Sequence, residues 1–457
     1  MSPETKDTAR ILSNFFAGLT FDKIPAEAIE TTRMFIADYY AACYAGIKVN
    51  DSFNRAIMDV IQNMSGSGNS SVFASDKKFP AENAAFMNAV YAHGADMDDG
   101  NRKAMGHVAA HVMSAVFALA ESLGNKTWED VLTAVTAGYE TYNRVGAMAQ
   151  PGLVHRGFHS TGTAGAVACG AACAKLMGLD ENGIYNAIGI ASVQASGLLI
   201  ITESGQSCKP LNPANAAKTG IISAKLAAAG VKGPEHPLES KKGWFHAMTD
   251  EVHYEFLDDL GEVFTICESY LKPYPSCRHT HCGIEAAISI SSEMSEKGLT
   301  VGDISKMRLY IYNNAIQIAG QIKIPTTPDD AKFSVHYSLA AAMLTGNYTL
   351  DDLEQAPTQA AAQLVDKIEL IPDASMEDTA SGVRGARLAV EFNDGTVSER
   401  TVLLPKGDAA NPFTWDDMVR KMRACMQGFD CSADDAARYI RTFDTKQFFK
   451  GITLPVL

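Results

Sequence analysis

Residues 388–404, LAVEFNDGTVSERTVLL, show most directly where this chain contains β-sheet. Apolar side chains at Leu388, Val390 and Phe392 alternate with polar or small residues, as they do on the two faces of a strand. The pair Asp394–Gly395 then separates this run from a second β-rich run, which is a strong signal for a tight hairpin. We therefore predict two antiparallel strands here.

The segments that precede this hairpin mix strands with helices. Residues 307–312 and 368–371 have the short, β-branched and aromatic composition of strands. Between them, residues 334–344 and 350–365 have the spacing of apolar residues that is typical of helices. The region around the hairpin is therefore predicted to be a mixed α+β unit.

The first 260 or so residues are predicted to be mostly helical. One apolar stripe with helical spacing begins after Pro25 and is expected to stop at Gly46, and another is expected to stop at Gly124. Residues 127–130 resemble a capping box, with Asp where Glu or Gln is usual. Residues 163–179 are rich in Ala, Gly and Cys, which predicts a helix packed closely against its neighbours.

Helical patterns return at the C-terminal end, in residues 414–417 and 432–443. We therefore predict a mainly α fold, in which a large all-helical domain of residues 1–268 and 406–457 is interrupted by a smaller α+β domain of residues 269–405. The sequence contains no internal repeat and no low-complexity tract.

The bulk composition indicates a globular protein of 457 residues, with 46% hydrophobic and 20% charged residues. Its formal charge of -14 argues against a nucleic-acid binder, because such proteins need a basic face to neutralise phosphates. A small anionic substrate remains compatible with this charge, since a local cluster of cations can reverse the field inside a cleft.

The nine cysteines are odd in number and include no C-x-x-C pair. A disulfide framework, a structural zinc site and an iron–sulfur cluster are therefore not expected, and a reducing cytoplasm fits better. Residues 1–6 lack a basic start followed by an apolar core, so no signal peptide is predicted. No apolar run reaches 18 residues, so no membrane span is predicted either.

Four segments gather polar and charged groups among glycines and prolines. The first, residues 93–100, contains three carboxylates within four residues. Either they hold a cation or a catalytic base, or they are only the solvated acidic end of a helix. His107 and His111 follow at the i, i+4 spacing of zinc ligands. The intervening Glu of an H-E-x-x-H motif is missing, so we predict no metal site.

The second segment, residues 156–162, comes just before the Ala-rich helix. Ser160 or Thr161 is expected to cap this helix, and its N-terminal amides would then form an anion site beside His159. The alternative is an ordinary loop histidine.

The third and fourth segments carry cations. Lys209, in residues 205–217, stands among Gly, Pro and small residues and is either a carboxylate ligand or an exposed lysine. Residues 272–281 contain Lys272, Arg278 and two histidines. We expect these side chains to line a cleft between the helical body and the α+β insert, the alternative being a solvated basic turn.

These segments together resemble the MmgE/PrpD family, which includes 2-methylcitrate dehydratase, cis-aconitate decarboxylase and iminodisuccinate epimerase. The resemblance runs nearly end to end and in matching order, through residues 95–99, 107–124, 157–180, 209–233, 272–286 and 331–337. It implies a helical domain interrupted by an α+β lid, an active site between them, no cofactor, and usually a homodimer.

Matching residue by residue, the resemblance implies site positions at Asp96, His107, His159, Lys209, Lys272 and His281. Cationic side chains, with Arg278 added to the two lysines, are then candidates for binding substrate carboxylates and the charge that develops on carbon during the reaction. The histidines at 107 and 159 are candidates for general acid and base, and the aspartate could orient one of them or accept a proton itself.

Three departures from the family pattern concern the reaction. Gly100 replaces a frequent Thr, Asn212 replaces a frequent His, and Cys277 stands where decarboxylase-like members have a His. Asn212 and Cys277 remain candidate substrate contacts, and the cysteine is either a proton donor or inert.

These three changes count against decarboxylation. The sequence therefore leaves three classes of function open. The first is a lyase that dehydrates or decarboxylates a small di- or tricarboxylate. The second is an epimerase of a dicarboxylate such as iminodisuccinate, and the third is a non-catalytic binding protein.

Overall fold

The computed structural model describes residues 6–202, 207–378 and 383–452. Residues 1–5, on which the expectation about a leader rests, and Gly205 and Gln206 of the third polar segment lie outside the described residues. The chain divides into two compact units. The larger unit contains Met1–Gly94, Asp98–Tyr270 and Thr414–Leu457, and the smaller contains Ala95–Met97 and Leu271–Phe413.

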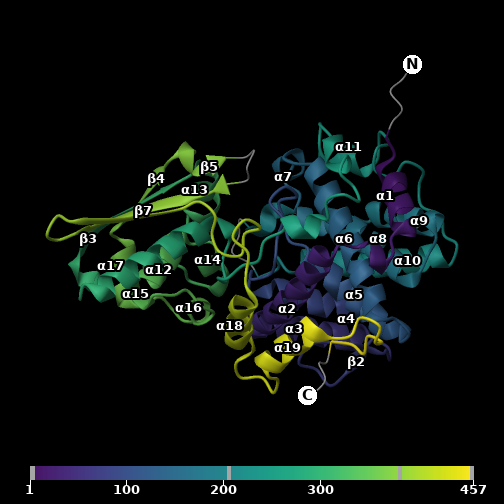
Figure 1. Ribbon diagram of the computed structural model, residues 1–457, viewed down its shortest axis with the longest axis horizontal. Coiled ribbons are helices and arrows are strands. Elements are labelled where there is room, and N and C mark those ends of the chain that lie inside the picture. The colour runs from purple at the N-terminus through teal and green to yellow at the C-terminus, as the bar shows by residue number, and fades with distance from the viewer. Residues whose placement is uncertain (1–5, 203–206, 379–382, 453–457) are drawn as a thin grey trace. The chain divides into compact units, whose positions relative to one another are not determined.

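The larger unit is built from helices, with one short pair of strands (Figure 1). The α-helices are α1 (Thr8–Gly18), α2 (Ala26–Lys48), α3 (Asp51–Met64), α4 (Ala81–Gly94), α5 (Ala109–Leu123), α6 (Trp128–Met148), α7 (Gly152–His155), α8 (Ser160–Met177), α9 (Glu181–Ser192), α10 (Leu211–Ala228), α11 (Trp244–Met248), α18 (Trp415–Met426) and α19 (Ala433–Thr442). The strands are β1 (Ser70–Ser71) and β2 (Lys78–Phe79), and 3-10 turns lie at Phe21–Lys23, Leu199–Thr202, Tyr254–Leu257 and Thr265–Glu268.

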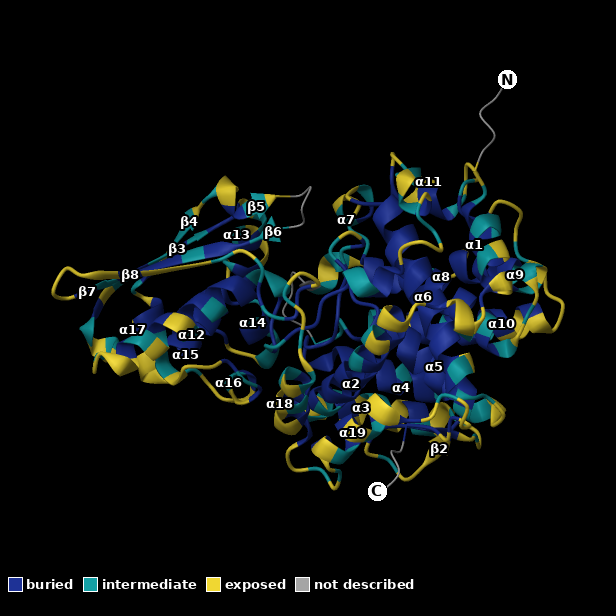
Figure 2. Cartoon of the chain, in the orientation of Figure 1, coloured by how far each residue is buried: buried dark blue, intermediate teal, exposed yellow. Residues whose placement is uncertain are grey.

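The core of this unit lies around α5, α6 and α8, which Figure 2 shows as almost wholly buried. Small residues let α8 and α10 approach closely, since a side chain at Gly220 would collide with Cys169. The predicted close packing of the Ala-rich helix is thereby confirmed.

Two predicted helix ends are confirmed and one is wrong. Gly124 ends α5 in the left-handed conformation (φ 71°), and Thr127 with Asp130 forms the capping box of α6. Gly46, in contrast, lies inside α2, which continues to Lys48. A Cβ at this position would collide with the backbone oxygen of Tyr91, so the glycine serves the close approach of α4 and not a helix stop.

The expected cap of α8 is also wrong. Ser160 and Thr161 belong to the first turn of α8, and the N-cap position is taken by His159. Both hydroxyl groups have other partners: Ser160 Oγ accepts a hydrogen bond from Tyr142 and Thr161 Oγ1 accepts one from the backbone N–H of His107. The helix start is thus held by surrounding elements and not by its own side chains.

The smaller unit is a four-stranded sheet with helices. The strands are β3 (Ile304–Ile311), β4 (Ile368–Pro372), β7 (Ala386–Phe392) and β8 (Val397–Val402), in the order β4-β3-β7-β8, with β3 and β4 parallel and the other pairs antiparallel. Strands β5 (Glu377–Asp378) and β6 (Val383–Arg384) form a separate pair. The helices are α12 (His281–Glu296), α13 (Asn313–Ala319), α14 (Pro328–Lys332), α15 (Val335–Thr345), α16 (Asp351–Glu354) and α17 (Gln359–Val365), with 3-10 turns at Arg278–Thr280, Val301–Asp303 and Ala374–Met376.

Helix α12 packs on β7 and β8 and against α15, which in turn packs against α17 (Figure 1). The predicted hairpin is confirmed, because β7 and β8 pair in register and Gly395 turns between them with φ 82°. The single helix predicted over 350–365 is wrong. Pro357 interrupts it, and Thr358 caps a new helix, α17.

The prediction of a mainly α chain with a smaller α+β part is confirmed. No helix among the described residues combines the length and the hydropathy that crossing a bilayer requires.

Candidate active site

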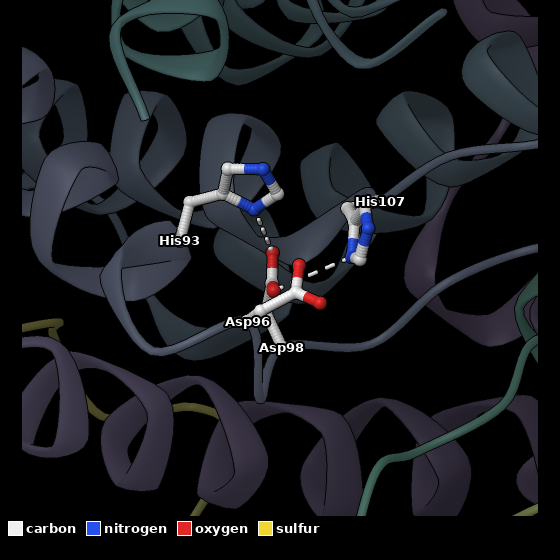
Figure 3. A group of neighbouring side chains, drawn as sticks. All are labelled: His93, Asp96, Asp98 and His107. Atoms are coloured by element: carbon white, nitrogen blue, oxygen red, sulfur yellow. Dashed lines mark hydrogen bonds and ion pairs between the residues drawn. The ribbon is translucent and has the colours of Figure 1, made fainter. Parts of the chain in front are cut away.

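A buried carboxylate lies between two imidazole rings in the larger unit (Figure 3). His93, at the end of α4, places Nδ1 2.8 Å from Asp98 Oδ2, and His107 places Nδ1 3.3 Å from Asp98 Oδ1. The side chains of His93 and Asp98 are both 0% exposed. Because an isolated ion is costly in such a place, the protonation states of this group are set by its members.

Burial lowers the pKa of His93 to about 4, against the opposing charge of Asp98 and together with the positive charge of Lys209. Burial alone would raise the pKa of Asp98, but His107 and His93 hold it well below its usual range. At neutral pH the group is therefore an ionised Asp98 that accepts a hydrogen bond from the Nδ1–H of a neutral His93.

The tautomer of His107 is fixed by a backbone acceptor. Its Nδ1 lies 2.7 Å from the carbonyl oxygen of Asp99, which can only accept a hydrogen bond, so Nδ1 carries the proton. In the neutral ring the lone pair is then on Nε2, which is the arrangement of a general base.

The Asp99 side chain anchors the start of α5. Its Oδ1 accepts hydrogen bonds from the backbone N–H groups of Val108 (3.1 Å) and Ala109 (2.8 Å), and its Oδ2 accepts one from the hydroxyl group of Tyr139 (2.7 Å). Burial raises the pKa of Asp99 to about 7, and the charge of Asp98 adds to this rise. The side chain therefore holds in place the segment that carries His107.

His159 is fixed at the N-cap of α8. Its backbone N–H donates to Gly197 O (3.0 Å), and its carbonyl oxygen accepts from the backbone N–H of Thr163 (3.1 Å). Its ring Nδ1 lies 2.9 Å from Nδ2 of Asn212, at the start of α10, and its ring centroid lies 6.1 Å from that of His93.

The structure thus brings together several sequence-predicted residues of the larger unit. His107 and His159 both lie near His93, Asn212 contacts His159, and Lys209, in the turn before α10, is close enough for its charge to act on His93.

In the smaller unit, Lys272 and Asp96 form a buried pair. Lys272 Nζ donates to the carbonyl oxygen of Asp96 (2.9 Å) and lies 3.2 Å from its Oδ2, and the two side chains are 1% and 5% exposed. Asp96 has φ 53°, a left-handed conformation that is uncommon outside glycine and clusters at functional sites. Lys272 therefore stabilises both the left-handed backbone conformation of Asp96 and the negative charge of its carboxylate.

Arg278 and His281 form a second polar group in this unit. Arg278 donates to Nδ1 of His281 (3.2 Å), and Nε2–H of His281 donates to the carbonyl oxygen of Ser276 (3.1 Å). Arg278 also lies 3.4 Å from a carboxylate oxygen of Asp408 and donates to the carbonyl oxygen of Lys406 (3.3 Å). Burial, together with the charges of Arg278 and Lys272, lowers the pKa of His281 well below its usual value.

Cys277 precedes Arg278 and is buried, and its backbone N–H donates to the carbonyl oxygen of Lys332 (2.9 Å). Direct contacts of Cys277, Arg278, His281 and Asn212 with a substrate stay predictions.

His93, Asp98 and His107 also offer nitrogen and oxygen atoms of the kind that bind transition metals, all within 4.8 Å of one another. The two imidazole atoms that face Asp98, however, are Nδ1 atoms engaged in hydrogen bonds, and a metal ion would have to displace both protons. The donor set therefore fits a hydrogen-bonded acid–base group better than a metal site.

Sequence reasoning missed the roles of His93, Asp98 and Asp99. The available signal was the run of three carboxylates in four residues, bounded by His93 and His107. Only the matched position, Asp96, was singled out, because spacing alone does not show which carboxylate meets which ring.

The chain matches a known protein family over most of its length. The MmgE/PrpD N-terminal domain matches residues 10–257 and the MmgE/PrpD C-terminal domain matches residues 274–444. The chain is 28% identical to the cis-aconitate decarboxylase-like protein oryM of Aspergillus oryzae, over 92% of this chain and 90% of that protein. It is 27% identical to human cis-aconitate decarboxylase (76% and 73%) and 24% identical to 2-methylcitrate dehydratase of Escherichia coli (52% and 51%). The chain therefore belongs to the MmgE/PrpD family and is an enzyme of the dehydratase or decarboxylase type.

Proposed function

We propose that the protein is a cofactor-free lyase that removes water or CO2 from a small citrate-like or aconitate-like acid. The relatives that match most of this chain's length are named for decarboxylation of cis-aconitate, and others are named for dehydration of 2-methylcitrate. Both reactions place negative charge on a carbon next to a carboxylate. We propose Asp96, His107, His159, Lys209 and Lys272 as the catalytic residues.

The observation that carries this proposal is the fixed tautomer of His107. Its Nδ1–H is committed to the Asp99 carbonyl oxygen (2.7 Å), with the ionised Asp98 3.3 Å away, so Nε2 is the atom that accepts a proton. The negative charge of Asp98 favours the imidazolium that forms when His107 takes this proton. In a dehydration, Nε2 of His107 would take the proton from carbon, the electron pair of that C–H bond would form the C=C bond, and the hydroxyl group would leave as water with the proton of the imidazolium. In a decarboxylation, the protonated ring would return a proton to the carbanion left by CO2.

The lysines are proposed to stabilise the negative charge. A carbanion next to a carboxylate delocalises its charge onto oxygen, where a preorganised cation acts most strongly, and loss of one such donor costs about 2.7–4 kcal/mol in known enzymes. Asp96 holds Lys272 from two atoms, which reduces the freedom of its long side chain before substrate arrives. Arg278, His281, Asn212 and Cys277 are proposed as further contacts to the substrate.

The decisive experiment incubates the protein with citrate, 2-methylcitrate and cis-aconitate in deuterated buffer and follows each acid by NMR. Dehydration gives an alkene, and decarboxylation gives CO2 with deuterium on the product carbon. Activity that survives dialysis against a chelator would support a metal-free mechanism. If none of these acids is converted, the lyase proposal fails.

A second candidate is an epimerase of a dicarboxylate such as iminodisuccinate. The observation that favours it is the same base at His107, which can remove a proton from carbon, together with Gly100, Asn212 and Cys277 at positions where lyases of the family carry other residues. Inversion also needs a donor that delivers a proton to the opposite face of the carbon, and we propose Cys277 for this role. An epimerase would exchange substrate protium for solvent deuterium without forming an alkene or CO2.

We further propose that the protein is a cytoplasmic homodimer. Light scattering coupled to size-exclusion chromatography would test the assembly, with a mass near twice 49.0 kDa expected.

A further inference from the structure

We propose that His159 acts as a neutral hydrogen-bond donor to negative charge on a substrate oxygen, and that Asn212 is the positioning residue that keeps it in this form. This inference rests on the proposed function and sharpens it, because His159 would then stabilise charge without transferring a proton itself.

The contact between Asn212 and His159 selects one tautomer. The amide Nδ2 of Asn212 has two N–H groups and no lone pair to offer, so the ring Nδ1 that lies 2.9 Å from it must accept. In the neutral ring the proton is then on Nε2. The imidazolium form would turn a second N–H group toward the amide N–H, and so the same contact opposes a second proton on the ring.

The position of His159 in the fold also favours the neutral ring. The residue is the N-cap of α8, an 18-residue helix whose positive dipole end disfavours a nearby cation. A histidine that a helix N-terminus keeps neutral is a known electrophile in other enzymes, where it polarises a substrate oxygen through its N–H group. The helix thus supplies a second reason for a neutral donor.

The contact is held rigidly on both sides. A side chain at Gly162 would meet the Cβ of Asn212 at 3.3 Å, and one at Gly197 would meet its amide carbon at 3.2 Å. The His159 backbone is bound to Gly197 through its N–H group and to Thr163 through its carbonyl oxygen. The backbone that carries the His159 ring is thus fixed, and the two glycines approach the Asn212 side chain closely.

The two histidines at this site are thereby prepared for different tasks. His107 gives its Nδ1–H to a carbonyl oxygen and keeps a lone pair on Nε2, whereas His159 accepts at Nδ1 and keeps its proton on Nε2. One ring is arranged to take a proton and the other to donate a hydrogen bond. Turnover then needs one proton carrier, His107, and leaves the protonation of His159 unchanged.

The test exchanges the amide for an acceptor of the same shape. In Asn212→Asp, the new carboxylate accepts from Nδ1–H of His159, so the neutral ring carries its lone pair on Nε2 and no longer donates there. The assay is run at pH 9, where the Asp–His pair is expected to be neutral at the ring and ordinary lysines keep their charge. Among the described residues, the titratable side chains near this ring include His93, whose ring centroid lies 6.1 Å away and on which the charge of Lys209 acts.

We expect kcat at pH 9 to fall by about 10²–10³-fold, as for the loss of one donor to a developing oxyanion. The matched control is Asn215→Asp, which adds the same charge to the same helix at an exposed position and should change kcat less than about twofold. Asn212→Leu, which removes the contact without imposing the other tautomer, should fall between the two. Thermal unfolding of each variant checks that the fold is kept.

A spectroscopic readout separates this inference from the proposed function. In protein with ¹⁵N-labelled histidine, the His159 signals, assigned by comparison with His159→Gln, should show a neutral ring protonated at Nε2 in the wild type and at Nδ1 in Asn212→Asp. A wild-type ring that is protonated at Nδ1 overturns the inference even if the enzyme turns over. The expected tautomers without turnover of any offered acid would leave Asn212 as the positioning residue and reject the lyase.

Discussion

The candidate site residues of the larger and the smaller unit are mostly buried, but their hydrogen-bond partners differ. In the larger unit, His93 and His107 share the carboxylate of Asp98, and the carbonyl oxygen of Asp99 fixes the tautomer of His107. In the smaller unit, Lys272 and Arg278 are held by backbone carbonyl oxygens in addition to single carboxylates. The first arrangement fixes which nitrogen carries a proton, and the second fixes where a cation lies.

This difference assigns different consequences to substitutions in the two units. Hydrogen bonds from a cation to the backbone of distant segments contribute to folding, because Arg278 links residue 278 to residues 405–408 and Lys272 links residue 272 to residue 96. Imidazole rings that share a carboxylate mainly determine which ring nitrogen can accept or donate a proton during the reaction. Substitutions in the larger group should therefore lower kcat, and some in the smaller group should lower stability.

The largest expected effect is that of His107→Gln. Glutamine keeps an amide N–H but has no basic nitrogen, so kcat should fall by about 10²–10⁴-fold while the melting temperature stays close to that of the wild type. Steady-state kinetics with the acid that proves to be the substrate, and calorimetry on the same sample, measure both. A variant that keeps more than a tenth of the wild-type kcat would remove His107 from the mechanism.

The next largest effect should be a loss of stability in the variant Arg278→Met. Arg278→Met leaves the buried carboxylate of Asp408 without the nearby guanidinium, and breaking a buried pair from one side costs about 3–5 kcal/mol. Urea unfolding should show this loss, and Arg387→Met, which removes a partly exposed arginine of β7, should cost less than about 1 kcal/mol. If Arg278→Met instead raises KM and leaves the unfolding free energy unchanged, Arg278 binds substrate and the comparison between the units fails.

The fold was predictable wherever a local signal decides it. The Asp394–Gly395 turn, the capping box at Thr127 and the left-handed Gly124 each depend on residues close in sequence. Gly46 was misjudged because its role depends on Tyr91, which is 45 residues away and invisible to periodicity. The break at Pro357 was visible in the sequence, and here the helical pattern on both sides was given too much weight.

The candidate site was predictable as a set of residue types but not as a set of contacts. His107, His159 and Lys209 were singled out from the sequence, and they lie near one another in the larger unit. The pairing of Asp98 with two rings depends on how the turn after α4 directs three neighbouring carboxylates, which no spacing rule specifies. The tautomers depend on whether the partner atom is a carbonyl oxygen or an amide nitrogen, and that requires coordinates.

A smaller loss of activity should distinguish Asp98 from the catalytic base, His107. In Asp98→Asn the charge that favours protonated His107 is lost, while the bond from His107 to Asp99 remains. Residues that orient a functional group in this way typically contribute about 10–100-fold to activity. Steady-state kinetics of Asp98→Asn measure this loss, and thermal unfolding of the same sample checks that the fold is kept. A kcat/KM equal to that of the wild type would mean that Asp98 serves only the fold.

The smallest effect at neutral pH is expected one helical turn beyond His107, at His111. Its ring is wholly buried, and neither ring nitrogen has a hydrogen-bond partner among the described residues. Burial, with the nearby positive charge of His93 when that ring is protonated, lowers the pKa of His111 to about 3. The unfolded chain therefore takes up a proton as the pH falls below about 6.5 and the folded protein does not until about pH 3, so stability is present above pH 6.5 and is lost through this window.

His111→Leu removes the pH dependence of stability that His111 contributes, together with the two ring nitrogens that lack a partner. It should raise the free energy of unfolding by about 1 kcal/mol at pH 7.5. The advantage over the wild type should grow by about 1.4 kcal/mol for each pH unit below 6.5. Urea unfolding at pH 7.5 and 5.5 measures both values, and His246→Leu, at an exposed position of α11, controls for loss of a histidine as such. Equal pH slopes for His111→Leu and the wild type would show that His111 is satisfied in solution. The ring of His111 would then have a hydrogen-bond partner in solution, as the rings of His93 and His107 do.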